Sequence, residues 1–157
     1  ILYIARRLVR FAEEDVGLAD PNALTQAISA QQAYSFLGSP EGELAICQAV
    51  IYLATAPKSN SGYVAFKNAK QLSDTTGSLM PPMHILNAPT QFMKKHGYSE
   101  GYIYDPDTPE SFSGQNYFPD GIQHQTLYNP VERGFEREIK KRIEYWNKLR
   151  TIKQKQF

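Results

Sequence analysis

The side chains best suited to metal binding are three histidines and one cysteine, but their spacing does not fit a zinc site. His84, His96 and His124 stand far apart, and Cys47 lies within an apolar helical pattern. Zinc sites usually take ligands in pairs about two to five residues apart. We therefore expect no metal site. We expect His96 to serve a helix C-terminus and Cys47 to be a buried thiol in a reducing compartment.

The carboxylates also lack the grouping that catalysis or cation binding requires. Three adjacent acidic residues at 13–15 would fan out around a helix, so they should be solvated or paired with cations. Asp105, Asp107 and Glu110 have a faint likeness to a calcium loop, but prolines interrupt the pattern and the rest of the loop is missing. Turn formation is the better interpretation of these acidic residues.

Nucleotide and nucleophile motifs are absent from the sequence. No GxxxxGK[ST] string occurs, so this chain alone should not hydrolyse ATP. Ser78, Ser111 and Ser113 have no local nucleophile signature. We assign no catalytic, cofactor-binding or metal-binding residue, and an autonomous enzyme is the weakest of the functional hypotheses.

Two basic groups are the candidate contacts for DNA or a partner protein. A helix near the start carries three arginines, and the terminal helix has a face of lysine and arginine interleaved with glutamate. Such a mixed face is commonly only solvated, whereas direct contact with phosphates is the alternative. The candidate residues are Arg6, Arg7, Arg10, Arg133, Arg137, Lys140 and Lys141. We expect the first three to pair with nearby acids or with a neighbouring subunit.

The composition indicates a soluble protein that is not a polyelectrolyte. The 157 residues carry a net charge of +1, which argues against binding nucleic acid through overall charge. No apolar run reaches the roughly 18–20 residues of a membrane span, and no signal-peptide pattern is present. We expect a cytoplasmic protein. The amphipathic pattern begins without a methionine or capping residue, so we also expect the chain to be part of a longer protein.

Helical spacing and terminal signals predict four successive helices in residues 1–76. The first ends at Gly17, and Ile4, Leu8, Phe11 and Ala12 form its buried face. Asp20 caps the second, with Pro21 at its first position and Gly38 at its end. The third runs from Ser39 and Pro40 to Ala56, and its nearly continuous apolar residues predict a core helix surrounded by others. The fourth spans about 59–72 and makes contacts through Tyr63, Val64, Phe66 and Ala69.

The second half of the chain is predicted to be less regular. Residues 77–128 form an ordered excursion rich in proline and tyrosine, with a short helix from Pro89 to His96 and room for a small β-hairpin. A capping-box pattern at 129–132 begins a long terminal helix over 129–157. Its apolar stripe contains Phe135, Ile139, Ile143, Trp146 and Leu149. The expected fold class is therefore mainly all-α, a helical bundle with an irregular aromatic excursion.

Several long segments resemble one protein family in order along nearly the whole chain. They are ARRLVRFAEEDVGLADP, GSPEGELAICQAVIYLATAPKSN, MHILNAPTQFMKKHGY and ERGFEREIKKRI. These segments resemble the C-terminal region of the replication-associated recombination protein A family, also called RarA or MgsA, which includes the Werner-helicase-interacting ATPases. Two positions depart from the family pattern as we know it: Glu13 replaces a small residue, and Leu86 replaces a basic residue before Asn87. The second departure puts a phosphate or partner contact through that loop in doubt.

The resemblance implies a collar-like helical domain related to clamp-loader subunits, which assembles an AAA+ ATPase into a homotetramer. It also implies that ATP and Mg²⁺ bind to a domain outside this chain, and that the complete protein acts in replication-fork maintenance, recombination and repair. The partners implied are DNA and single-stranded-DNA-binding protein, in a cytoplasmic, nucleoid-associated setting, with no membrane. The surplus of apolar surface independently favours an oligomerisation domain. A DNA- or partner-binding module with a basic helical face is the alternative function.

Overall fold

The computed structural model describes residues 1–154, and all regular structure in that range is helical. The predicted all-α class is confirmed, and these residues form no strand, so the possible hairpin is not formed. The chain divides into two compact units. Unit 1 contains residues 1–70 and 127–141, and unit 2 contains residues 71–126 and the described residues from 142 onwards. No helix among residues 1–154 has the length and apolarity needed to cross a bilayer.

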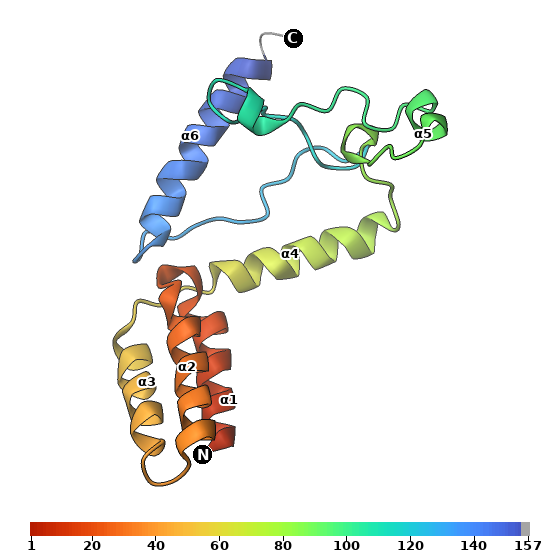
Figure 1. The fold of residues 1–157 in the computed structure, drawn as a ribbon. Coiled ribbons are helices and arrows are strands. Elements are labelled where there is room, and N and C mark those ends of the chain that lie inside the picture. The colour runs from red at the N-terminus through yellow and green to blue at the C-terminus, as the bar shows by residue number, and fades with distance from the viewer. Residues whose placement is uncertain (155–157) are drawn as a thin grey trace. The chain divides into compact units, whose positions relative to one another are not determined.

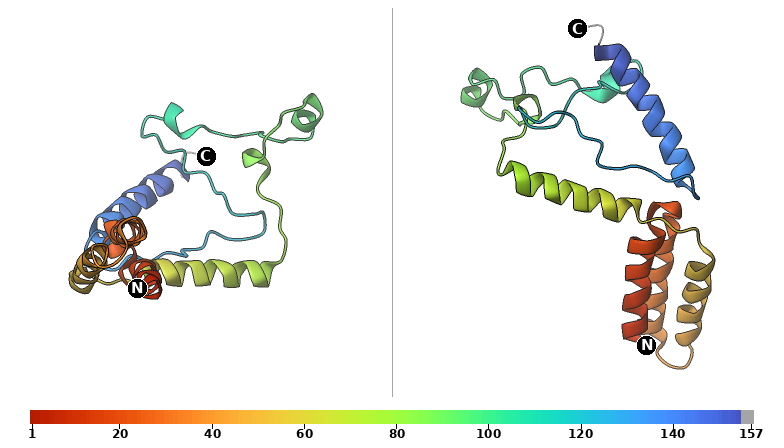
Figure 2. Two further views of the ribbon diagram at one scale, coloured as in Figure 1. Left: turned by 60° about the horizontal axis from the view of Figure 1, so that its bottom comes forward. Right: turned by 180° about the vertical axis from the view of Figure 1, so that it is seen from behind.

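Three helices of unit 1 lie side by side in all views (Figures 1 and 2). They are α1 (Leu2–Phe11), α2 (Asn22–Leu37) and α3 (Glu43–Thr55). A short π-helical turn, Ala12–Val16, and a 3-10 turn, Gly17–Ala19, connect α1 to α2. Gly17 ends the first helical segment as predicted, with a φ of 52°.

The core of unit 1 is built mainly from alanine. Seven of the ten buried apolar residues are alanines, and the largest of the others are Val16, Ile46 and Leu53. Small side chains allow helices to approach closely, so α1, α2 and α3 pack tightly with little apolar volume between them. Leu8 and Phe11 are half-buried against this core, as predicted, whereas Ile4 is exposed. The prediction that Ile4 belongs to the buried face is wrong.

Both predicted ends of α2 are accurate. The Asp20 carboxylate accepts a hydrogen bond from the Asn22 amide at 3.1 Å, so it caps α2 as expected. Gly38 follows α2 with a φ of 74°, and its amide donates to the Tyr34 carbonyl. The start of α3 differs from the prediction, because residues 39–42 form a turn. Within that turn the Ser39 hydroxyl bonds the Glu43 carboxylate instead of capping the helix.

Helices α3 and α4 are less buried than their sequences predict. In α3, Ile46, Ala49 and Leu53 are buried on one face, while Cys47 on the other face is exposed. The predictions of a helix surrounded on all sides and of a buried Cys47 are therefore wrong. Helix α4 (Ser61–Thr76) is longer than predicted and buries only Ser61, and Phe66 is 70% exposed. Tyr63 and Val64 are also exposed, contrary to prediction.

The terminal helix begins later than predicted. Helix α6 spans Glu136–Gln154, so residues 129–135 form an irregular lead-in and not the first helical turns. The predicted stripe holds for Ile139, Ile143, Trp146 and Leu149, which are half-buried, but Phe135 is exposed. The last three residues of the predicted range 129–157 lie outside the described residues.

Unit 2 contains short helical turns within an irregular segment. Helix α5 (Gln91–Lys95) begins after Thr90, whose hydroxyl accepts from the Met93 amide at 3.2 Å, so the cap is Thr90 and not the predicted start at Pro89. The imidazole of His96 bonds the Phe92 carbonyl at 2.8 Å, which confirms its predicted role at a helix end. Trp146 stacks on Phe112 with ring centres 4.9 Å apart. The aromatic residues thus order this part of the chain.

Candidate functional site

Three segments of unit 1 meet at one junction, which fixes the end of the three-helix layer. They are the turns after α1, the link between α3 and α4, and the lead-in to α6. The Ser59 amide donates to the Asp15 carbonyl at 2.8 Å, and the Phe135 amide donates to the Ala19 carbonyl at 2.8 Å. These bonds pair backbone groups of segments far apart in the sequence. The junction therefore holds the segments in one geometry.

A buried carboxylate, that of Glu136, is the centre of the junction. Its side chain is 0% exposed and accepts hydrogen bonds from the Ser59 hydroxyl at 2.9 Å, the Tyr128 hydroxyl at 2.8 Å and the Val131 amide at 2.9 Å. The Ser61 hydroxyl is a fourth donor. A buried charge is stable only when such donors replace water. Glu136 therefore connects the α4 start, the 128–131 segment and the α6 start.

The donors change the proton affinity of both partners in this network. Burial acts to raise the pKa of Glu136, but the hydrogen bonds from Ser61, Val131, Tyr128 and Ser59 outweigh it and leave the pKa below its ordinary value. Burial and the bond to Glu136 raise the pKa of Tyr128 to about 12. The carboxylate is therefore charged and the phenol is neutral at neutral pH.

Two glycines allow the segments to approach this closely. Gly134 has a φ of 50°, and a Cβ atom there would lie 2.0 Å from the Ala19 carbonyl oxygen. Gly17 has a φ of 52°, and a Cβ atom there would lie 2.7 Å from the Ser59 carbonyl oxygen. Both positions require glycine, because a positive φ disfavours other residues and a Cβ atom would overlap a backbone carbonyl oxygen.

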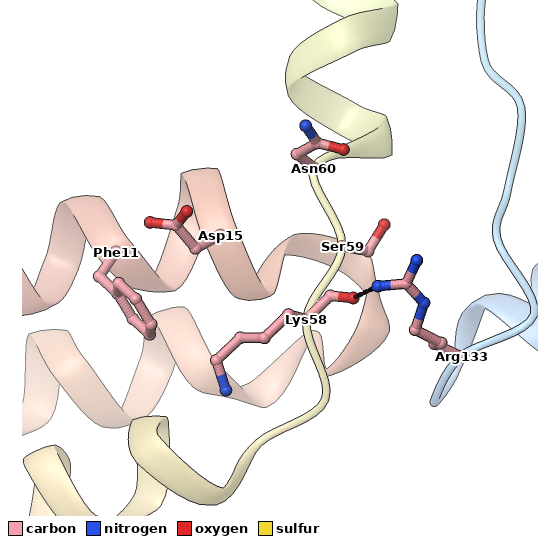
Figure 3. Close-up of a pocket in the computed structure, with 6 residues that line it drawn as sticks. All are labelled: Phe11, Asp15, Lys58, Ser59, Asn60 and Arg133. Carbon is pink, nitrogen blue, oxygen red and sulfur yellow. Dashed lines mark hydrogen bonds between the residues drawn. The ribbon is translucent and has the colours of Figure 1, made fainter.

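A hollow of about 310 Å³ lies beside the junction, lined by Phe11, Asp15, Lys58, Ser59, Asn60 and Arg133. Figure 3 shows that the ammonium of Lys58 and the guanidinium of Arg133 point in different directions. The Lys58 ammonium donates to the carbonyls of Leu53, at 2.9 Å, and Ala56, so it serves the end of α3. Arg133 donates to the Lys58 carbonyl at 3.0 Å. These cations hold backbone segments and do not converge on one ligand position.

The predicted arginines of α1 are exposed. Arg10 lies 2.8 Å from Glu14, and the hydrogen bond to Glu14 raises the pKa of Arg10 above its ordinary value. Arg6 and Arg7 are exposed, and neither forms an ion pair with an acid among residues 1–154. These two arginines are the basic side chains that remain available on α1.

The basic residues predicted near the terminal helix are engaged in contacts with their own neighbourhood. Lys140 lies 2.5 Å from Glu132, and Lys141 lies 2.8 Å from Glu138. The Arg137 guanidinium donates to the Glu132 carbonyl at 3.1 Å. The hydrogen bond with Lys140 lowers the pKa of Glu132. Together with Arg133 at the junction, these residues form a mixed-charge surface and not a continuous cationic one.

The other candidates for chemistry lie apart or take structural roles. In unit 2 a hollow of about 390 Å³ has His84, Glu100 and Asp120 among its lining residues. No three acidic, histidine or cysteine residues within 1–154 are arranged to hold a metal ion. Asp105 accepts from the Ser113 amide at 2.8 Å within a 3-10 turn, which confirms turn formation, and the bonds from Ser113 lower the pKa of Asp105.

Glu136 and Gly134 are the residues that the sequence reasoning missed. The sequence did contain a signal, because Glu136 stands on the same helical stripe as Ile139, Ile143 and Trp146, with spacings of three, seven and ten. A carboxylate on an apolar stripe indicates a buried charge with dedicated donors. Gly134 lies two residues before it, where a close backbone approach could have been expected.

The exposed apolar side chains of unit 1 are larger than those in its core. Phe36 is 89% exposed, Leu44 is 76% exposed, and Tyr3 is 74% exposed. These side chains belong to α2, α3 and α1, so each of the three neighbouring helices exposes a large apolar side chain.

Comparisons with known proteins agree on one family. The family model described as "MgsA AAA+ ATPase C terminal" matches residues 1–147. Replication-associated recombination protein A of Coxiella burnetii is 47% identical over 148 residues, which cover 94% of this chain and 34% of that protein. Its namesake in Haemophilus influenzae is 46% identical over 91% of this chain and 32% of that protein. ATPase WRNIP1 of Dictyostelium discoideum is 41% identical over 81% of this chain. The chain spans about a third of the bacterial relatives.

Proposed function

Because the chain belongs to the family of MgsA-type AAA+ ATPase C-terminal regions, we propose that it is the oligomerisation domain of such an ATPase. The domain joins four copies into a homotetramer and sets the relative positions of the attached ATPase domains. ATP and Mg²⁺ bind to the ATPase domain and not to this chain. The domain itself is not an enzyme.

One observation carries this proposal: small apolar side chains are buried in unit 1, whereas many of its large apolar side chains are exposed. The buried core is mainly alanine, whereas Phe36, Leu44 and Phe66 are mostly exposed. Oligomers use such a surplus, since covering apolar surface is the main favourable contribution to association. The junction around Glu136 also supports the proposal, because its hydrogen bonds hold the segments that lead into α4 and α6 in fixed positions within unit 1.

The cellular role that follows is replication-fork maintenance, recombination and DNA repair. Relatives that match this chain carry the name replication-associated recombination protein A. The assembled ATPase would act on DNA and would associate with single-stranded-DNA-binding protein in the cytoplasm, at the nucleoid. This chain contributes the assembly geometry to that role.

Light scattering over a range of protein concentrations tests the proposed assembly. We expect a mass of about four times 17.8 kDa at the higher concentrations. A mass of one chain at all concentrations would contradict the proposal.

A second candidate function is direct DNA binding, which Arg6 and Arg7 favour, because both are exposed and neither forms an ion pair within residues 1–154. Two arginines that contact phosphates would give a modest salt dependence, with a logarithmic slope of roughly −2 for a duplex. The measurement is the affinity of the chain for duplex DNA at several salt concentrations. Tight, salt-dependent binding by a monomeric chain would favour this function over assembly.

A further inference from the structure

Helix α3 carries an apolar seam on its exposed face. Leu44, Cys47, Ile51 and Ala54 are all exposed, and their spacing of three, four and three residues places them on one side of the helix. This is the spacing with which two helices pack side by side. Leu44 is 76% exposed and Ile51 is 60% exposed, so neither contributes to the core of unit 1. We call these four residues the α3 seam.

The α3 seam is free of charge, unlike the exposed surfaces of α1 and α4. Residues 44–57 contain no acidic or basic residue, whereas α1 has Arg6, Arg7 and Arg10, and α4 has Lys67, Lys70 and Asp74. Two copies of α1 that met face to face would bring arginines together, which is costly. An uncharged apolar seam is complementary to its own copy and offers no partner for DNA phosphates.

We propose that the α3 seam is the surface through which two copies of this chain pair in a symmetric contact. This inference rests on the proposed assembly and names the face that carries it. In an isologous contact the same patch occurs on both sides. If the helices run in opposite directions, Leu44 meets Ala54 of the partner subunit and Cys47 meets Ile51 of the partner subunit; if they run in the same direction, each seam residue meets its own copy. The two Cys47 thiols are about one helical turn apart along the axis in the first case and adjacent in the second, so a short crosslinker reaches between them in both.

The residues that precede α3 extend the pairing surface. A single face of a 13-residue helix is smaller than the roughly 800 Å² per partner that a stable interface buries. Phe36 and Leu37 end α2 next to the turn that leads into α3, and they are 89% and 54% exposed. Figure 1 shows this turn at the same end of unit 1 as the start of α3. These residues supply additional apolar area at the same end of unit 1 as Leu44.

The test combines a charge in the seam with crosslinking through Cys47, the only cysteine in the chain. A short bifunctional maleimide should convert most of the wild-type chain into a covalent dimer, because the paired helices lie about 8–10 Å apart. Ile51→Glu should reduce crosslinking at least tenfold and reduce the mass of the assembly to half or less. It should also raise the reactivity of Cys47 with a thiol reagent. Ile51 is exposed, so the fold should persist, as circular dichroism would verify.

The matched control is Phe66→Glu on α4, which places the same charge on an equally exposed apolar position. It should leave the Cys47 crosslink intact, even if it affects another contact of the tetramer. An oligomeric wild type that forms no Cys47 dimer, or an Ile51→Glu variant with unchanged mass, would overturn the α3 seam while leaving the proposed assembly standing. A wild type that is monomeric at all concentrations would overturn both.

Discussion

Glu136 shows how one buried residue can join the starts of two helices to the irregular segment between residues 128 and 131. The carboxylate is fully buried, and four donors from two segments, 59–61 and 128–131, surround it. Removing a buried acceptor leaves its donors unsatisfied, which costs more than the bonds themselves contribute. The apolar stripe of α6 was predictable from sequence, but the donors of Glu136 were not, because Ser59 and Ser61 lie more than seventy residues away.

We predict that Glu136→Ala lowers the free energy of unfolding by about 3 kcal/mol, because a charged acceptor with several hydrogen bonds is lost and its donors stay buried. Urea unfolding followed by far-ultraviolet circular dichroism measures this change. Glu132→Gln is the matched control, because it removes an exposed ion pair with Lys140, and this loss should cost less than about 1 kcal/mol. Equal losses in the two variants would contradict the role given to Glu136.

The lowered pKa of Glu136 also determines how the free energy of unfolding changes in acid. Folding lowers the pKa of Glu136, so the unfolded chain takes up this proton first as the pH falls. The stability that it contributes is therefore fully present above pH about 4.5, the ordinary value, and is lost as the pH falls through the folded pKa. Glu136→Gln should make the free energy of unfolding depend less on pH below about 4.5, where the loss begins in the wild type. Urea unfolding measured at several pH values between about 6 and 3 would show this difference. A profile of unchanged slope would contradict the assignment.

At the scale of elements, both ends of α2 were predicted accurately. Asp20 and Gly38 act within their own turns, so their roles followed from sequence. The start of α6 did not, since the capping-box pattern at 129–132 competes with Gly134 and with the bond from the Phe135 amide to the Ala19 carbonyl. Tertiary contacts prevailed over a local capping preference there. The prediction that Cys47 is buried was wrong because α3 buries only one of its apolar faces inside unit 1.

We predict that Gly134→Ala destabilises unit 1 by about 3 kcal/mol or more, since the positive φ is unfavourable and the new methyl group would overlap the Ala19 carbonyl. Urea unfolding monitored by circular dichroism provides the value. Gly121→Ala is the control, because Gly121 also has a positive φ, at 87°, but has open space around it, and it should cost only about 1 kcal/mol. If the two substitutions cost the same, the close approach at Gly134 contributes nothing.

At the scale of the whole molecule, the proposed assembly depends on apolar surface that the described residues leave exposed. The all-α class and the family could be predicted from sequence, because helical periodicity and long motifs both persist along the chain. The position of the exposed apolar surface could not, since an apolar helical pattern does not reveal which of its faces meets a partner. Phe66 and Leu44 illustrate this limit: both fit helical patterns, and both are exposed.

Sedimentation equilibrium of the chain at low and at high salt tests the proposed apolar assembly. If apolar contacts hold the assembly together, a tetramer should be present at both salt concentrations, since screening weakens contacts between exposed charges and not the covering of apolar surface. A chain that sediments as a monomer, or a tetramer that dissociates when salt is added, would contradict the claim.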